Sequence, residues 1–103
     1  MTAPALDIAD AELAIVKSIL KRYVPDATVW AFGSRVTGKA KKFSDLDLCV
    51  QLETPLGVDR ASELSEAFAE SDLPWKVDVV DWATTSEAFR QIIERQRVIV
   101  SYI

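Results

Sequence analysis

Hydrophobic side chains recur at intervals of three and four residues along three stretches of the chain, and this spacing predicts three amphipathic helices. Polar capping residues or turn residues flank each stretch. In the last helix we expect Phe89, Ile92 and Ile93 to point inward. The three predicted helices run from Asp7 or Asp10 to about Tyr23, from Asp59 to Ser71, and from Thr85 or Ser86 to the apolar tail 98–100.

Three other segments have the composition or the alternation that is typical of β-strands. β-Branched and aromatic residues fill 28–32, which predicts a buried strand that stops at Gly33. From Ser44 to Leu52 apolar and polar residues alternate with a period of two, so one face of this strand is expected to be apolar. The apolar face carries Leu46, Leu48, Val50 and Leu52, and the polar face carries Asp45, Asp47, Cys49 and Gln51. Residues 75–82 are the third candidate strand.

A short segment between Gly33 and Gly38 joins the first two strands. Ser34 is a good N-cap for one helical turn that ends at Thr37, and Gly38 closes that turn. The elements therefore alternate as helix, strand, helix, strand, helix, strand and helix, before the apolar tail 98–100. This order predicts an α/β (α+β) fold, with a small mixed sheet of three to four strands and helices packed against it.

Composition narrows the class of protein. A length of 103 residues, of which 50% are hydrophobic, fits a single globular domain that spans residues 1–103. Histidine is absent and Cys49 is the only cysteine, which excludes Ser-His-Asp, Cys-His and His-ligated zinc chemistry as well as an internal disulfide. No apolar stretch approaches the roughly 20 residues of a membrane span, and residues 1–10 do not resemble a signal peptide, so we expect a cytoplasmic protein. The net charge of −4 argues against extensive nucleic-acid binding.

Three carboxylates are the candidate metal ligands. Asp45 and Asp47 lie two residues apart on a predicted strand, so both side chains leave the same face about 6.6 Å apart. Asp78 lies between two valines, where a carboxylate is costly to bury unless a cation or strong hydrogen bonds compensate it. If the second and third strands are neighbours, the three groups converge. Hard oxygen ligands of this kind suit Mg²⁺ or Mn²⁺.

A candidate phosphate site precedes these acids in the chain. Gly33 and Ser34 stand at a strand-to-helix junction, where free backbone N–H groups favour a phosphate and the Ser34 hydroxyl adds a further donor. A phosphate site beside an acidic metal site indicates phosphoryl or nucleotidyl transfer by a two-metal mechanism.

The motif formed by these residues resembles a known family. Gly33-Ser34, the ten residues 35–44, Asp45-x-Asp47 and a later carboxylate at Asp78 are similar to the nucleotidyltransferase superfamily of DNA polymerase beta and kanamycin nucleotidyltransferase. The size of the chain points to the minimal nucleotidyltransferases, which this sequence resembles over nearly its whole extent.

The resemblance implies a partner, a reaction and a role for each site residue. It implies an antitoxin that transfers AMP from ATP to a tyrosine of a HEPN ribonuclease toxin. Asp45 and Asp47 would bind both metal ions, and Asp78 would bind the catalytic one and help deprotonate the acceptor. Gly33 and Ser34 would hold the triphosphate. Arg35 is counted with this phosphate-binding set, although the pattern leaves open whether it, Lys39, Lys41 or Lys42 contacts phosphate or the toxin.

Two alternatives concern the motifs themselves. Asp81 competes with Asp78 as the third ligand, but it lies near the strand end, where water or the next turn can satisfy it. Gly33 to Lys39 also matches a P-loop up to its last position, where Ala40 lacks the hydroxyl that would bind magnesium. We therefore disfavour both.

Two further alternatives concern the function. A non-catalytic antitoxin could occlude the toxin through apolar surface such as Trp82 and residues 98–103. Transfer to a small molecule or an RNA end is disfavoured, because the chain leaves little surface for such acceptors and is negatively charged.

Overall fold

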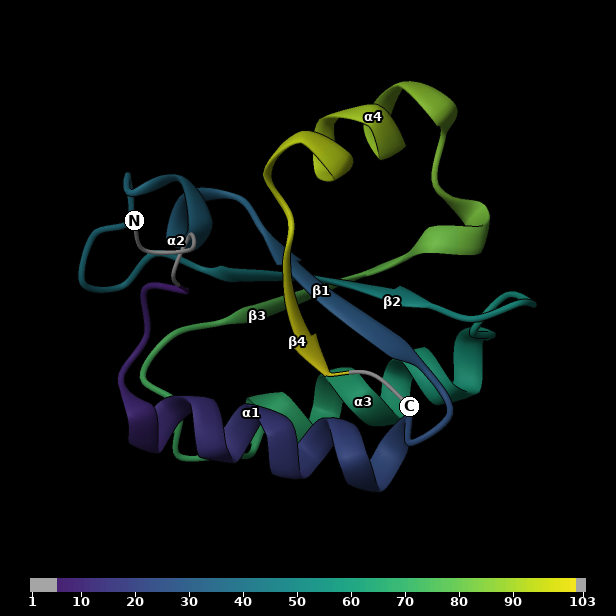
Figure 1. The fold of residues 1–103 in the computed structure, drawn as a ribbon. Helices are drawn as coiled ribbons and strands as arrows, with labels where there is room; N and C mark the ends of the chain where they lie inside the picture. Colours follow the sequence, from purple (N-terminus) through teal and green to yellow (C-terminus); the bar gives the residue numbers. More distant parts are fainter. Residues whose placement is uncertain (1–5, 102–103) are drawn as a thin grey trace.

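A four-stranded sheet separates two helical layers of unequal size (Figure 1). The computed structural model describes residues 6–101. Helices α1 (Asp10–Tyr23) and α3 (Val58–Ala69) cover one face of the sheet. The other face carries α4 (Glu87–Gln96), preceded by the 3-10 turn η1 (Trp82–Thr84). The predicted arrangement of a small sheet with helices packed against it is confirmed.

The sheet is mixed, and its strands follow the order β3-β2-β1-β4. These strands are β1 (Thr28–Phe32), β2 (Leu46–Gln51), β3 (Val77–Asp81) and β4 (Val98–Ser101). β1 runs antiparallel to both β2 and β4, whereas β2 and β3 are parallel. A parallel pair needs a crossover connection, and α3 supplies it. The apolar tail 98–100 thus belongs to a fourth strand.

The alternation of residues along β2 is reproduced in the packing. Leu46, Leu48 and Val50 are fully buried in the larger core, together with residues of α1 and α3. On the opposite face Cys49 is also fully buried, because it packs with Phe32 and with Ile93 of α4. The polar face predicted for β2 is therefore covered by α4 along part of its length.

The inward face of α4 differs from its prediction. Ile93 is fully buried, but Phe89 is 37% exposed and Ile92 is 45% exposed. The smaller core has only Phe32, Cys49 and Ile93 at its centre, which is too few residues to cover a whole helix face. Phe89 meets only the edge of the Phe32 ring, with the ring centroids 5.7 Å apart.

The helix starts also differ in detail. Helix α1 begins at Asp10, but its N-cap is Ala9, whose N–H donates to Glu12 Oε1 at 2.8 Å, so neither Asp7 nor Asp10 caps it. The one-turn helix α2 (Ser34–Thr37) has Gly33 at its N-cap, so Ser34 is its first residue and not its cap. Gly38, with φ +80°, closes this helix as predicted.

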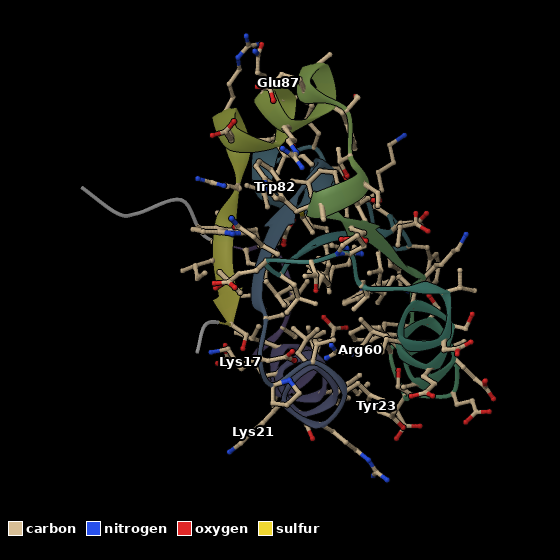
Figure 2. All side chains as sticks on the ribbon, turned by 90° about the vertical axis from the view of Figure 1, so that its right-hand side faces the viewer. Lys17, Lys21, Tyr23, Arg60, Trp82 and Glu87 are labelled. Carbon is tan, nitrogen blue, oxygen red and sulfur yellow. The ribbon has the colours of Figure 1, made fainter. Side chains whose placement is uncertain are left out.

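A cation ties α3 to the end of α1. Arg60 lies between the two helices (Figure 2) and donates to the carbonyl of Tyr23 at 3.2 Å and to Asp26 at 2.7 Å. The pKa of Asp26 is lowered chiefly by this hydrogen bond from Arg60.

Two observations bear on the expectations about membranes and termini. Among residues 6–101 no helix is long and apolar enough to cross a bilayer. Two expectations fall partly outside the described residues. These are the comparison of 1–10 with a signal peptide, for residues 1–5, and the proposed apolar surface, for residues 102–103.

Candidate active site

The β2–β3 register brings two of the predicted acids together. Asp47 pairs with Asp78 across the parallel strands, so both side chains leave the sheet on the same face. Adjacent strands lie about 4.8 Å apart. On its other side Asp47 pairs with Phe32, the last residue of β1. The predicted adjacency of the second and third strands is therefore confirmed.

Gly33 follows Phe32 and touches Asp47. Its φ of +82° belongs to the region that favours glycine. A Cβ placed on Gly33 would overlap the Oδ2 and Cγ atoms of Asp47. Only a glycine allows this approach, so the conformation and the space both require it. The candidate phosphate turn and the candidate metal ligand are thus in direct contact.

The electrostatics of Asp47 reflect the other two acids. The pKa of Asp47 is raised, first by burial, then by the negative charge of Asp78 and then by that of Asp45. Asp45 is exposed and lies immediately before the first residue of β2. Asp78 is half-exposed and has Lys76 Nζ at 3.4 Å from its Oδ1. The three carboxylates therefore influence one another, with Asp47 at the centre.

The donor set fits a hard divalent cation. Carboxylate oxygens are the ligands that Mg²⁺ and Mn²⁺ prefer, and a cation would relieve the repulsion that raises the pKa of Asp47. Within residues 6–101, however, no three His, Cys, Asp or Glu side chains are grouped closely enough to hold a metal ion as they stand. Side-chain rearrangement of Asp45 or Asp78 would be part of binding.

The backbone around Gly33 is held from several directions. Its carbonyl accepts from the N–H groups of Val36 and Thr37 at 3.0 and 3.1 Å, which fixes the start of α2. Its own N–H donates to Oε1 of Gln96, the last residue of α4. Ser34 is half-buried beside it. The turn is a defined structure and not a loose loop.

Arg35 has a different place from the one expected of a phosphate ligand. It is 5% exposed and its guanidinium lies 4.5 Å from the centre of the Trp75 ring. Its donors are used by main-chain oxygens, namely those of Ser44 and Asp7 at 2.9 Å, Lys42 at 3.2 Å and Lys41 at 3.4 Å. We therefore remove Arg35 from the phosphate-binding set, because it fastens the loop that leads to Asp45.

Asp81, the competitor of Asp78, is engaged elsewhere. Its Oδ2 accepts from the N–H of Leu56 at 2.9 Å, and its Oδ1 accepts from the N–H of Ala83 at 3.2 Å. One oxygen thus stabilises the backbone of η1 and the other stabilises the loop between β2 and α3. This arrangement favours Asp78 as the third acid of the site.

The family follows from comparison with known sequences. The family model for the nucleotidyltransferase domain matches residues 13–102. The chain belongs to the nucleotidyltransferase domain family. It is also 63% identical over 95 residues to the probable protein adenylyltransferase MntA of Haemophilus influenzae, an alignment that covers 92% of this chain and 83% of the relative.

Solved structures show the same nucleotidyltransferase fold. A toxin-antitoxin crystal structure with AMP-PNP matches with a TM-score of 0.76 and 25% identity, over 88% of this chain and 73% of that one. A chain in the solved structure described as the tri-AMPylated HEPN toxin of Shewanella oneidensis in complex with MNT antitoxin matches with a TM-score of 0.69 and 22% identity, over 90% of this chain and 71% of that one. The resemblance inferred from the sequence is therefore confirmed at the level of family and fold.

One residue of this nucleotidyltransferase site carried no signal in the sequence. Gln96 lies 63 residues from Gly33, and a single glutamine near the end of a helix belongs to no motif. The two residues meet because β4, which follows α4 in the chain, pairs with β1. This pairing places the end of α4 beside Gly33.

Proposed function

We propose that the protein is a metal-dependent adenylyltransferase that transfers AMP from ATP to a tyrosine hydroxyl of a HEPN toxin and so acts as its antitoxin. The observation that carries this proposal is the position of Asp47, which touches Gly33 and pairs with Asp78. The family and the 63% identical relative, which is named a probable protein adenylyltransferase, support the same reaction. With ATP as donor, we expect the reaction to take place in the cytoplasm.

The chemistry assigns a separate task to each part of the site. Ser34 would bind the phosphate chain through its backbone N–H and its hydroxyl, and Gly33, whose own N–H is held by Gln96, would let the phosphate come close to the backbone. Asp45 and Asp47 would bind Mg²⁺ or Mn²⁺, whose positive charge would neutralise part of the negative charge of the triphosphate. Asp78 would complete this ligand set on the acceptor side.

The transfer step is a displacement at the α-phosphorus of ATP. The acceptor oxygen forms a bond to this phosphorus while the bond to the bridging oxygen of the leaving group breaks, and pyrophosphate departs. Asp78 takes the proton of the acceptor hydroxyl. A carboxylate suits this task because it can accept a proton, and Asp78 lies on the same face of the sheet as Asp47.

The acceptor can approach from the outer side of β3. This strand is at the edge of the sheet, and a hollow of about 580 Å³ opens beside it. Lys76, Asp78, Trp75 and Phe68 are among the residues that line the hollow. The hollow lies on the α3 side of the sheet, whereas Asp78 is half-exposed at the open edge of β3, so we expect an acceptor hydroxyl to reach Asp78 across this edge.

The test is transfer of label from ATP labelled at the α-phosphate to a HEPN toxin in the presence of Mg²⁺. We expect the wild type to label the toxin, and we expect Asp45→Asn with Asp47→Asn to lower the rate at least 100-fold. Glu63→Gln with Glu66→Gln is the matched control, because it removes the same charge from α3 at a distance from the site. Labelling that survives in the double Asn variant, or in the presence of EDTA, would contradict the proposal.

A non-catalytic antitoxin is the second candidate, and one observation favours it. Phe89 and Ile92 expose apolar side chains on α4, on the same face of the sheet as the acids. Such side chains suit a protein contact. If the double Asn variant neutralises the toxin at the same dose as the wild type, occlusion and not transfer explains the protection.

A further inference from the structure

Gln96 is the part of the site that neither the motif nor the proposed reaction accounts for. It is the last residue of α4, it is half-buried, and its side chain accepts a hydrogen bond from the N–H of Gly33. No residue between 6 and 101 accepts a hydrogen bond from its amide nitrogen. One end of the Gln96 amide is therefore used and the other is available.

The hydrogen bond fixes which end of the amide is available. A backbone N–H can only donate, so the atom of Gln96 that faces Gly33 must be Oε1. The Nε2 group, with two N–H donors, then points away from Gly33. Because rotating the amide would place two donors against each other, this orientation is stable.

The topology places Gln96 at one end of a row of site residues. β4 pairs with β1 from Val98, opposite Ala31, and the side chain of Gln96 meets Gly33, the residue that follows the end of β1. In order from β3, the site residues are Asp78 on β3, Asp47 on β2, Gly33 just after β1 and Gln96 at the end of α4. The acids lie at one end of this row and a neutral donor lies at the other.

We propose that Gln96 binds the phosphate chain of the nucleotide through its Nε2 group. This inference rests on the proposed function, which places the phosphates over Gly33 and Ser34. A phosphate chain neutralised at the acidic end still needs hydrogen-bond donors at its other end, and hydrogen bonds from an amide to an anionic oxygen are strong. Through Oε1 the same side chain also holds the turn in place.

The substitution Gln96→Glu separates these two tasks. A glutamate keeps an oxygen that accepts from Gly33 N–H, but it loses the Nε2 donors and brings a negative charge towards the phosphates. We expect the thermal midpoint to stay near that of the wild type, and the KM for ATP to rise at least about tenfold. We expect kcat to change by less than about threefold, since Gln96 lies at the opposite end of the row from Asp78, the group that we assign to the acceptor.

Gln96→Ala and Gln91→Glu complete the set of variants. Gln96→Ala loses both tasks, so the KM for ATP should rise and the thermal midpoint should fall. Gln91→Glu makes the same change of charge on an exposed residue of α4 and should behave as the wild type. Gln96→Ala also keeps the test decisive if Gln96→Glu does not fold.

Direct binding of α,β-methylene-ATP, measured by calorimetry, provides a readout that needs no toxin. We expect weaker binding by at least about tenfold in Gln96→Glu and no change in Gln91→Glu. Unchanged binding and KM in Gln96→Glu, or a fall in kcat alone, would overturn the assignment of Gln96. Failure of the wild type to transfer AMP would overturn the proposed function instead, and the binding arm would still decide the role of Gln96.

Discussion

At the scale of single residues, the site depends on the contact between Gly33 and Asp47. Both residues can be predicted from the sequence motif, because the family resemblance depends on their spacing along the chain. It could not show that they touch, since that contact arises from the pairing of Phe32 with Asp47 across two strands. Arg35 lies inside the same motif and is counted with the phosphate-binding set. Its burial, however, depends on contact with Trp75, which is 40 positions away in the sequence.

We predict that Gly33→Ala abolishes transfer and destabilises the fold. A methyl group at this position overlaps the carboxylate of Asp47, and the φ of +82° is strained for alanine. The cost should be about 1 to 3 kcal/mol in the free energy of unfolding. Urea denaturation gives this value, and Gly57→Ala is the control, because its φ of +87° is similar but nothing lies within 4 Å of the added methyl group. Equal losses in both variants would show that strain alone matters.

Asp47→Asn should raise stability while it removes activity. Burial and the charges of Asp78 and Asp45 raise the pKa of Asp47, so the ionised form is disfavoured in the folded protein. Neutralising this side chain should raise the thermal midpoint at pH 7 by about 2 to 4 °C, as expected from a gain of under 1 kcal/mol after solvent screening. A lower midpoint in Asp47→Asn would contradict the repulsion that we infer.

The same shift predicts how stability and metal binding respond to pH. A carboxyl whose pKa is raised on folding binds its proton more tightly in the folded state, so its destabilising effect is present above the folded pKa and disappears as the pH falls through it. The stability gain of Asp47→Asn should therefore shrink on acidification below the raised pKa. Mg²⁺ binding to the wild type should weaken over the same range, because the cation needs the ionised form. Thermal scans and calorimetric titrations across this range measure both effects.

At the scale of elements, the loop before β2 is organised by Arg35. The pattern of residues predicted β2 and α2 well, because each has a local signal: alternation for the strand and flanking glycines for the turn. The helix caps and the exposure of Phe89 and Ile92 were predicted less well, since they depend on neighbours in space. The strand at 98–101 was seen only as an apolar tail, because four residues are too few to show alternation.

Arg35→Ala should destabilise the protein by about 2 to 4 kcal/mol, because four carbonyl groups lose a charged donor and Trp75 loses its packing partner. Transfer should fall as well, because the loop that it fastens leads directly to Asp45. Urea denaturation and KM for ATP check both statements. Arg95→Ala, at an exposed position on α4, is the control and should change stability by less than about 0.5 kcal/mol. If Arg35 were a phosphate ligand, KM would rise without the loss of stability.

At the scale of the whole molecule, Cys49 reports on the integrity of the packing between the sheet and α4. It is fully buried between the sheet and α4, and burial, with a smaller effect of Asp81, raises the pKa of its thiol to about 11. A higher thiol pKa leaves less of the reactive thiolate at any pH below it. We predict that native protein reacts with a thiol reagent at pH 8 only through global opening. The rate should therefore rise with urea in parallel with unfolding seen by fluorescence, and fast reaction without urea would show that α4 opens separately.

The parallel pairing of β2 with β3 has a consequence for how this site tolerates change over evolution. The register of Asp47 and Asp78 is fixed by hydrogen bonds across the sheet and not by the length of chain that connects the two strands. Insertions or deletions in the connecting loops, at 52–57 or 70–76, would alter the path between the acids but not their separation. The spacing from Gly33 to Asp47 has no such freedom, because Arg35 fixes the path of the intervening loop. Length variation among related chains should accordingly accumulate after Asp47 and be scarce before it.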